Sequence, residues 1–222
     1  MDYNDVRVTL RWHTQNPIKV VCEAAGITMK RNFDFKDVVE SKKMIARLLT
    51  MKHTSVFEHV VFGFFIDGAS RAFLAQVTRH RMCSYTSGSQ HYQDHQNFSY
   101  LYPNGLSENG KKRFDELVRK INEEYTVMKN AGLDISEARM LLPNACCNKL
   151  LVTINARSLV NLFELRLCNR NVMEMRIVVH KIYNLVMAVF PELFGFVGPS
   201  CFMDKKCNQG SMKCEKGYWE KV

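Results

Sequence analysis

The stretch Gln76-Val-Thr-Arg-His-Arg-Met-Cys-Ser-Tyr-Thr-Ser-Gly-Ser-Gln-His-Tyr92 is the most informative in this chain. Arg79, His80 and Arg81 can all be cationic, and the loop that follows them is rich in hydroxyl groups as far as Ser89. Guanidinium groups make charge-assisted hydrogen bonds to phosphates, and hydroxyls add directed bonds of their own. Gly88 lets the backbone approach a ligand closely. The stretch therefore predicts a site for a phosphorylated ligand.

The helix in front of this stretch sets how its cations are presented. Ser70 is a good N-cap for a helix that ends near residue 78, which places Gln76, Arg79 and His80 at its C-terminal end. On a continuous helix, Arg79 and Arg81 would point to different sides. Two arginines that diverge from one turn can hold two ligands at once. The plain alternative is a solvated basic helix end, which the helix dipole favours.

Further out, the hydrophobic pattern predicts helices with a few strands between them. Strands are expected at residues 6–10, 60–66 and 150–154, and helices at 17–25, 35–51, 111–131, 158–168 and 172–190. Ser55-x-x-Glu58 has the form of a capping box, and Ser136 is expected to cap a short helix that Pro143 ends. Gly132 follows the clearest helix and should end it. The pattern indicates the α+β class.

Length and charge limit the possible functions. With 222 residues the chain is long enough for one compact domain, expected over 1–199, followed by a Cys-rich basic tail over 200–222. The apolar run 60–66 is too short to span a bilayer, and the N-terminus has no apolar secretory core, so we expect a cytoplasmic protein without a membrane partner. The net charge of +9 favours anionic ligands. Small phosphorylated ligands explain part of it, and long nucleic acid is not required.

The eight cysteines should be mostly reduced in the cytosol. Four of them lie in apolar or motif segments and are expected to be small core residues: Cys22, Cys83, Cys146 and Cys147. Cys201, Cys207 and Cys214 lie in the tail, where no core needs them, and Cys168 is a possible fourth ligand from the body. Their spacing lacks the tight pair of ordinary zinc modules. A metal or redox site and unliganded thiols both remain open.

Three more segments accompany the Arg79–Arg81 stretch. They are His53-Thr-Ser-Val-Phe-Glu-His59, Glu137-Ala-Arg-Met-Leu-Leu-Pro143 and Asn155-Ala-Arg-Ser-Leu-Val-Asn-Leu-Phe-Glu-Leu-Arg166. In this order, across roughly residues 50–190, the four segments resemble the motifs of the flavin-dependent thymidylate synthase (ThyX) family. Ordered agreement at four motifs is much more specific than agreement at one. The resemblance implies a helix-rich α+β domain with a small central β-sheet.

The resemblance also implies a role for individual residues. It implies flavin contacts from His53, Ser55, Arg79, His80, Arg81, Asn155, Arg157 and Asn161. It implies nucleotide contacts from Gln76, Arg79, Ser87, Gly88, Ser89, Gln90, His91 and Arg139. Arg166 would lie against the pyrimidine and favour an ionised ring nitrogen, which makes C5 more nucleophilic without an enzyme thiolate. Plain alternatives are a surface ion pair for Arg139 or Arg166 and a capped helix start for His53.

The implied reaction is the reductive C5 methylation of dUMP to dTMP. The methylene group would come from 5,10-methylenetetrahydrofolate, with FAD as hydride carrier and NADPH as reductant. The resemblance further implies a homotetramer whose active sites are shared between subunits. Ser89 is also conceivable as a nucleophile with His91 or His80 as its base, but this reading is not favoured, because the implied role of Ser89 is to hold the nucleotide.

Two positions depart from the pattern of the family. His91 stands where the family usually has Arg, and Ser87 where it often has an acidic residue or Gln. These changes put nucleotide affinity or identity in question, so an enzyme that acts on another pyrimidine nucleotide or adds a hydroxymethyl group is a second hypothesis. A nucleic-acid-binding protein is a third, although the aromatics of the basic tail are limited to Phe202, Tyr218 and Trp219. An inactive structural paralogue is a fourth.

Overall fold

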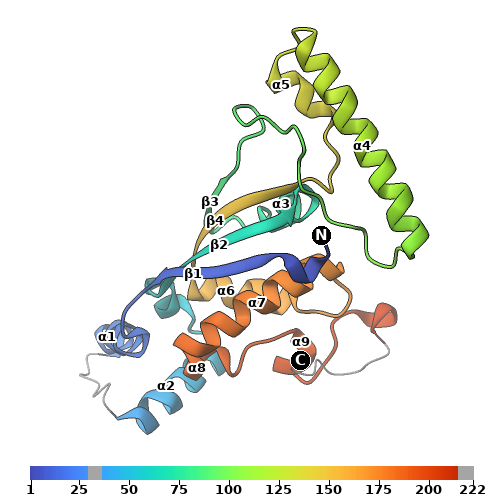
Figure 1. Cartoon of the computed structure of the whole chain (residues 1–222). Coiled ribbons are helices and arrows are strands. Elements are labelled where there is room, and N and C mark those ends of the chain that lie inside the picture. Colours follow the sequence, from blue (N-terminus) through green and yellow to red (C-terminus); the bar gives the residue numbers. More distant parts are fainter. Residues whose placement is uncertain (30–36, 215–222) are drawn as a thin grey trace. The chain divides into compact units, whose positions relative to one another are not determined.

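The computed structural model describes residues 1–29 and 37–214 (Figure 1). The contacts within the chain define two compact units. The first unit comprises Met1–Arg7, Phe65–Arg79 and Tyr85–Leu151. The second comprises Val8–Phe64, His80–Ser84 and the chain from Val152 onward. These units combine segments that are distant in sequence. The expected division at residue 199, into a domain and a C-terminal tail, is not tested by them and stays a prediction.

The predicted α+β fold is confirmed. Four antiparallel strands form one sheet in the order β1-β2-β4-β3, and helices make up most of the remaining regular structure. The bounds are Arg7–His13 for β1, Val61–Ser70 for β2, Cys83–Ser87 for β3 and Cys147–Asn155 for β4. Strands were expected near β1, β2 and β4, and the observed ones extend further along the chain than expected.

Strand β3 corrects the prediction of a hydroxyl-rich loop after Arg81. Residues Cys83–Ser87 are extended, and Gly88 N continues the pairing by donating to Lys149 O at 2.9 Å. Within the first unit, the Tyr85 hydroxyl donates to Val77 O at 2.8 Å. Serine, threonine and tyrosine all fit a pleated strand once a partner supplies the ladder hydrogen bonds. That partner is distant in sequence, which is why the local pattern indicated a loop.

The first unit carries helices α3 (Arg71–Val77), α4 (Glu108–Asn130) and α5 (Ile135–Ala138), with short 3-10 turns at Tyr3–Asp5 and Arg139–Leu141. The predicted cap of α3 is confirmed, because Ser70 Oγ accepts from Phe73 N at 3.0 Å. Gly132, at φ +98°, follows the end of α4 as expected. Asp134 and not Ser136 caps α5, which contacts α4 in Figure 1.

The helices of the second unit are α1 (Pro17–Met29), α2 (Val38–Thr50), α6 (Ala156–Arg166), α7 (Met173–Val189), α8 (Pro191–Phe194) and α9 (Ser200–Met203). Single 3-10 turns lie at Ser55–His59 and Gly210–Met212. Asp37 caps α2, so the helix begins later than expected, and residues 35 and 36 lie outside the described part. Pro191 ends α7 as predicted and opens α8.

Each unit has its own apolar core. In the second, Phe163 of α6 makes edge-on ring contacts with Tyr183 of α7 and Phe194 of α8, at centroid distances of 5.2 and 5.7 Å. The buried Tyr183 hydroxyl donates a hydrogen bond to Phe194 O at 3.0 Å. These contacts hold α6 and therefore fix the position of the residues at its two ends. In the first unit, buried Phe98, Val118 and Cys146 form the centre of a smaller cluster.

Trp12 of β1 lies against Gly63 of β2. A Cβ atom built on Gly63 would come within 2.0 Å of the indole ring, so only glycine fits there while the ring keeps its position. The indole remains 45% exposed on its other side. Gly63 therefore serves close packing of a large aromatic ring.

The cysteine predictions are partly confirmed. Cys22 and Cys146 are fully buried, and burial raises the pKa of the Cys146 thiol to about 11. Cys83 and Cys147 are only half-buried, so their assignment to the core was wrong. Among residues 1–29 and 37–214, no three His, Cys, Asp or Glu side chains gather closely enough to hold a metal ion, which leaves the metal alternative without support. The same residues include no helix long and apolar enough to cross a membrane.

Candidate functional site

Arg166 and His80 are two predicted site residues that a side-chain hydrogen bond joins. Arg166 is the last residue of α6, and its Nε donates to His80 Nε2 at 2.9 Å. Both residues belong to the second unit, although they lie 86 positions apart in sequence. The structure thus brings the predicted pyrimidine contact against a predicted flavin contact.

The environment of His80 keeps its ring neutral. The side chain is only 9% exposed, and burial, followed by the nearby charge of Arg166, lowers the pKa of His80 below the usual 6.5. Since a guanidinium N–H can only donate, Nε2 must accept, and the ring hydrogen lies on Nδ1. His80 is therefore a fixed acceptor that orients Arg166. The surface ion pair proposed as the plain alternative for Arg166 is not what the structure shows.

The start of α6 carries the next three predicted flavin contacts. The Asn155 side chain caps the helix by accepting from Ser158 N at 2.8 Å, which is why α6 begins earlier than predicted. Arg157 and Asn161 are both exposed and lie one helical turn apart, on the same face. Arg157 forms an ion pair with Glu58 of the 3-10 turn Ser55–His59. The Arg157 side chain is therefore anchored to α6 by its backbone and to the 3-10 turn by its ion pair.

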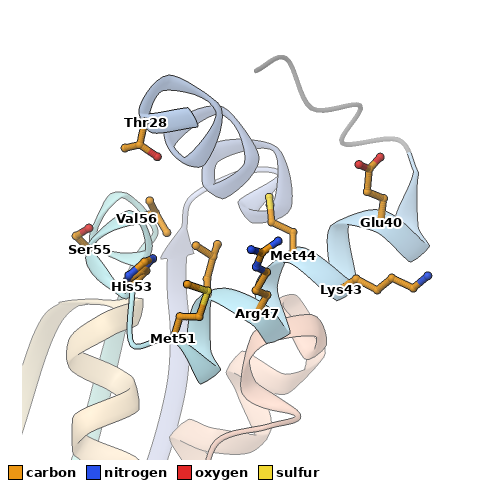
Figure 2. Close-up of a pocket in the computed structure, with 10 residues that line it drawn as sticks. Thr28, Glu40, Lys43, Met44, Arg47, Met51, His53, Ser55 and Val56 are labelled. Carbon is orange, nitrogen blue, oxygen red and sulfur yellow. The ribbon is translucent and has the colours of Figure 1, made fainter. Parts of the chain in front are cut away.

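His53 and Ser55 line a cavity of about 580 Å³ in the second unit. Figure 2 shows His53 and Arg47 facing the same space, with α2 on one side and Val56 of the 3-10 turn on another. Helix α2 ends at Thr50, and Lys52, two residues further on, adopts the left-handed conformation at φ +57°. Ser55 is no capping residue, contrary to prediction, since Thr54 precedes the turn without a side-chain cap.

The lining of this cavity is mixed. Its apolar surface comes from Met44, Leu48, Met51 and Val56. Its charged groups come from helix α2 and are Glu40, Lys43 and Arg47. A planar apolar ring system with anionic groups attached would find both kinds of contact here. The chemistry of the lining therefore fits a flavin. His53 is exposed and lies between α2 and the 3-10 turn Ser55–His59, whose N-cap is Thr54 without a side-chain cap.

Helix α3 ends close to its predicted end, and the basic stretch lies just beyond it. Thr78 is the C-cap, so Arg79 lies in the following turn and Arg81 beyond it. The argument that both would diverge from one continuous helix was therefore wrong. Gln76 is half-buried in the last turn of α3, and its backbone oxygen accepts from Arg79 N at 3.3 Å. Arg79 and Arg81 are both exposed.

The segment Ser87–His91 of the first unit is ordered mainly by its backbone. Ser89 Oγ accepts from His91 N at 3.2 Å, and Ser89 O accepts from Gln93 N at 3.1 Å. A Cβ atom built on Gly88 would stand 3.0 Å from Gln93 Oε1, so the glycine permits a close approach of the Gln93 side chain.

Ser89 does not have the surroundings of a nucleophile. Its hydroxyl is oriented by the backbone of His91, and the His91 ring makes no hydrogen bond to it among the described residues. The His91 ring is exposed and lies near Asp134. Hydrogen bonds from Ser136 lower the pKa of the Asp134 carboxyl most, and the charge of His91 lowers it further. The hypothesis of a Ser–His pair gains nothing from this geometry.

The remaining predicted nucleotide contacts are anchored differently. Arg139 Nε donates to Ser136 O at 2.8 Å, so the base of the guanidinium is fixed against α5 while the residue stays half-exposed. It is not part of a surface ion pair among the described residues. Gln90 is half-buried and lies near the thiol of Cys146.

Sequence reasoning missed several residues at these places. Lys43 and Arg47 are four positions apart on α2, a spacing that could have indicated a shared basic face. Glu58 was read as a capping residue and is the partner of Arg157. Asn171, whose side chain reaches Arg166, carried no signal in the sequence.

Comparison with known proteins gives a consistent result. The family model described as "Thymidylate synthase complementing protein" (Thy1) matches residues 9–192. A flavin-dependent thymidylate synthase of Clostridium tetani is 34% identical over 95% of this chain and 94% of its own length. The Pyrococcus furiosus protein of the same name is 31% identical over 98% of both chains.

A solved structure agrees in fold. The UMP/dUMP methylase PolB from Streptomyces cacaoi, bound with 5-Br dUMP, matches with a TM-score of 0.74 at 21% identity, over 86% of this chain and 93% of its own. The family match covers more than half of the chain, and the relatives align along nearly their whole length. This chain therefore belongs to the flavin-dependent thymidylate synthase family, Thy1.

Proposed function

We propose that this protein methylates C5 of dUMP to form dTMP, with FAD as its cofactor. The observation that carries the proposal is the hydrogen bond from Arg166 to buried His80, which orients the predicted pyrimidine contact inside a chain of this family. The names of the full-length relatives support the reaction. The nucleotide named for PolB supports a uridine-type substrate.

Arg166 would act on the pyrimidine through its charge. A guanidinium against the ring favours loss of the ring N3 proton, because the cation stabilises the resulting anion. The negative charge is shared with C5, which becomes the nucleophile toward the methylene carbon. His80 contributes by holding Arg166 without competing for its charge, since the ring is neutral. No thiolate is required.

FAD would supply the hydride that turns the transferred methylene group into a methyl group. His53 and Ser55, with the apolar and cationic lining of the cavity beside them, would hold part of this cofactor, and Arg157 and Asn161 would meet another part. We propose 5,10-methylenetetrahydrofolate and NADPH as co-substrates, a homotetramer as the assembly and the cytoplasm as the location. Each of these four rests on the family resemblance.

A second candidate is the same reaction on another pyrimidine nucleotide. His91 is exposed beside the Asp134 carboxylate, where the family usually has an arginine. A neighbouring carboxylate weakens the attraction for phosphate, so contacts elsewhere on the nucleotide would matter more. PolB is named as a methylase of both UMP and dUMP. Direct assays with dUMP and UMP in parallel separate the two candidates.

The decisive experiment is complementation of a bacterium that lacks thymidylate synthase. We expect the wild-type gene to permit growth without thymidine, and the purified protein to carry a flavin with absorbance near ~450 nm. Arg166→Ala should impair growth without thymidine. Arg119→Ala, on exposed α4 where the side chain pairs with Glu123, is a matched control that should grow normally. A purified protein that binds no FAD when titrated with it would exclude the proposal.

A further inference from the structure

We propose that Asn171 is a positioning residue, which fixes a second nitrogen of the Arg166 guanidinium while His80 fixes the first. The inference rests on the proposed function, because it concerns how Arg166 is presented to the pyrimidine. It adds a residue that the motif resemblance does not include.

Asn171 lies in the turn between α6 and α7, five positions after Arg166. Its backbone N donates to Cys168 O at 2.9 Å, which closes the turn. Its side-chain Nδ2 donates to Leu165 O at 2.6 Å. Because the donor end of the amide is committed to this carbonyl, the acceptor end, Oδ1, is directed away from it.

That acceptor faces Arg166. Arg166 Nη1 donates to Asn171 Oδ1 at 3.4 Å, while Arg166 Nε donates to His80 at 2.9 Å. The bond to Asn171 is longer and therefore weaker than the bond to His80, so we expect it to add a smaller restraint on the guanidinium. Nη2 makes no hydrogen bond with any described residue. Two of the three nitrogens are thus held, and the third is left to meet the substrate.

The same turn offers matched controls. Asn169 Nδ2 points to Cys214 Sγ at 4.0 Å, and Arg170 Nη1 donates to Met212 O at 2.8 Å. Both side chains therefore contact the C-terminal segment and not Arg166. Asn169→Ala removes the same chemical group from the same turn without touching the guanidinium.

The test uses the full-length flavin-loaded protein and 5-bromo-dUMP. A halogen at C5 lowers the pKa of ring N3 toward neutrality, so the ionised and neutral forms of the bound nucleotide can be measured by ultraviolet absorbance. If Asn171 positions Arg166, Asn171→Ala should raise the pKa of the bound ring by roughly half to one unit, and lower kcat by roughly three- to tenfold. KM should change less, and Asn169→Ala should behave as wild type.

A substitution by aspartate separates positioning from mere support of the turn. Asn171→Ala and Asn171→Asp both lose the donor to Leu165 O, so a role limited to the turn lowers the stability of both variants but leaves the pKa of the bound ring unchanged in each. If Asn171 acts through Arg166, the pKa of the bound ring should be higher in Asn171→Asp than in Asn171→Ala. The reason is that the new carboxylate offsets the charge of the Arg166 guanidinium. Thermal unfolding and flavin absorbance check that each variant is folded. Should Asn171→Ala not fold, Asn171→Asp against Asn169→Asp carries the same comparison.

The outcomes distinguish this inference from the proposed function. If Arg166→Ala leaves the pKa of the bound ring unchanged, the proposed role of Arg166 itself is wrong. If Arg166→Ala raises it, but both Asn171 variants match their Asn169 counterparts, Arg166 acts without Asn171 and the inference is overturned. Equal ring pKa values for Asn171→Ala and Asn171→Asp would also overturn it.

Discussion

Two regions predicted to contact the nucleotide are built in opposite ways. In the second unit, Arg166 is held through its side chain, by buried His80 at one nitrogen and Asn171 at another. In the first unit, Ser87–His91 is held mainly through its backbone, and the His91 ring is exposed. A side chain held on two sides tolerates little change. A segment held by its backbone can change its side chains and keep its shape, and the departures from the family pattern lie there.

The largest effect should come from breaking the side-chain-held region. Arg166→Ala removes one charge-assisted contact, so we expect turnover to fall by roughly ten- to a hundredfold, on the order of 1.5–3 kcal/mol. The flavin should stay bound, which absorbance of the purified protein checks. Loss of flavin from this variant would show that Arg166 serves the cofactor.

A second effect should appear at the start of the same helix. Arg157→Ala should weaken FAD about tenfold, measured by titration of the apoprotein, since one charge-assisted bond to the cofactor would be lost. Glu58→Gln serves as the control, because it releases Arg157 from its ion pair and leaves the cation in place. If Arg157→Ala and Arg166→Ala lose flavin to the same extent, the proposed division of the site is wrong.

The backbone-held region should respond to a gain of charge. His91→Arg supplies a permanent cation, and we expect nucleotide affinity at pH 8 to rise roughly three- to tenfold. Titration of both proteins with dUMP at pH 8 measures the difference. Equal affinities for both proteins would rule out a phosphate contact by His91.

The smallest expected effect is a pH dependence in the side-chain-held region. Burial and Arg166 lower the pKa of His80, so the folded state takes up its proton less readily than the unfolded chain. The contribution of His80 to stability is complete above pH 6.5 and is lost as the pH falls below that value. A protonated His80 also cannot accept from Arg166. The measurement is kcat/KM of wild type and of His80→Gln as the pH is lowered from 6.5 to about 5. We expect the decline to be about two- to threefold larger in wild type. Equal declines would show that another group titrates.

Local patterns predicted several local features of this fold, although the caps expected at Ser55 and Ser136 were wrong. Ser70 was identified as a cap, and Gly132 and Pro191 as helix ends, because caps and breakers act within a few residues. Strand β3 was missed because its ladder partner, β4, lies some sixty residues away in sequence. Nothing in the composition of Cys83–Ser87 demands a strand until that partner is present.

The candidate site shows the same limit. The resemblance named Arg166, His80 and Arg157, but their partners follow from tertiary structure. Arg157 meets Glu58 across 99 positions, and Arg166 meets His80 across 86. Asn171 is close in sequence, yet its contact depends on how the turn after α6 closes. Motifs thus predict which side chains form the site, and the fold decides what holds them.

The packing of Trp12 on Gly63 has a consequence for how relatives of this chain can diverge. A methyl group at position 63 would overlap an indole at position 12, so neither position can change freely while the other is kept. Accepted changes should come in pairs: a smaller residue at 12 opens position 63 to alanine or larger side chains, whereas a tryptophan at 12 confines it to glycine. The two positions would then evolve as one, across two neighbouring strands and fifty residues of intervening chain.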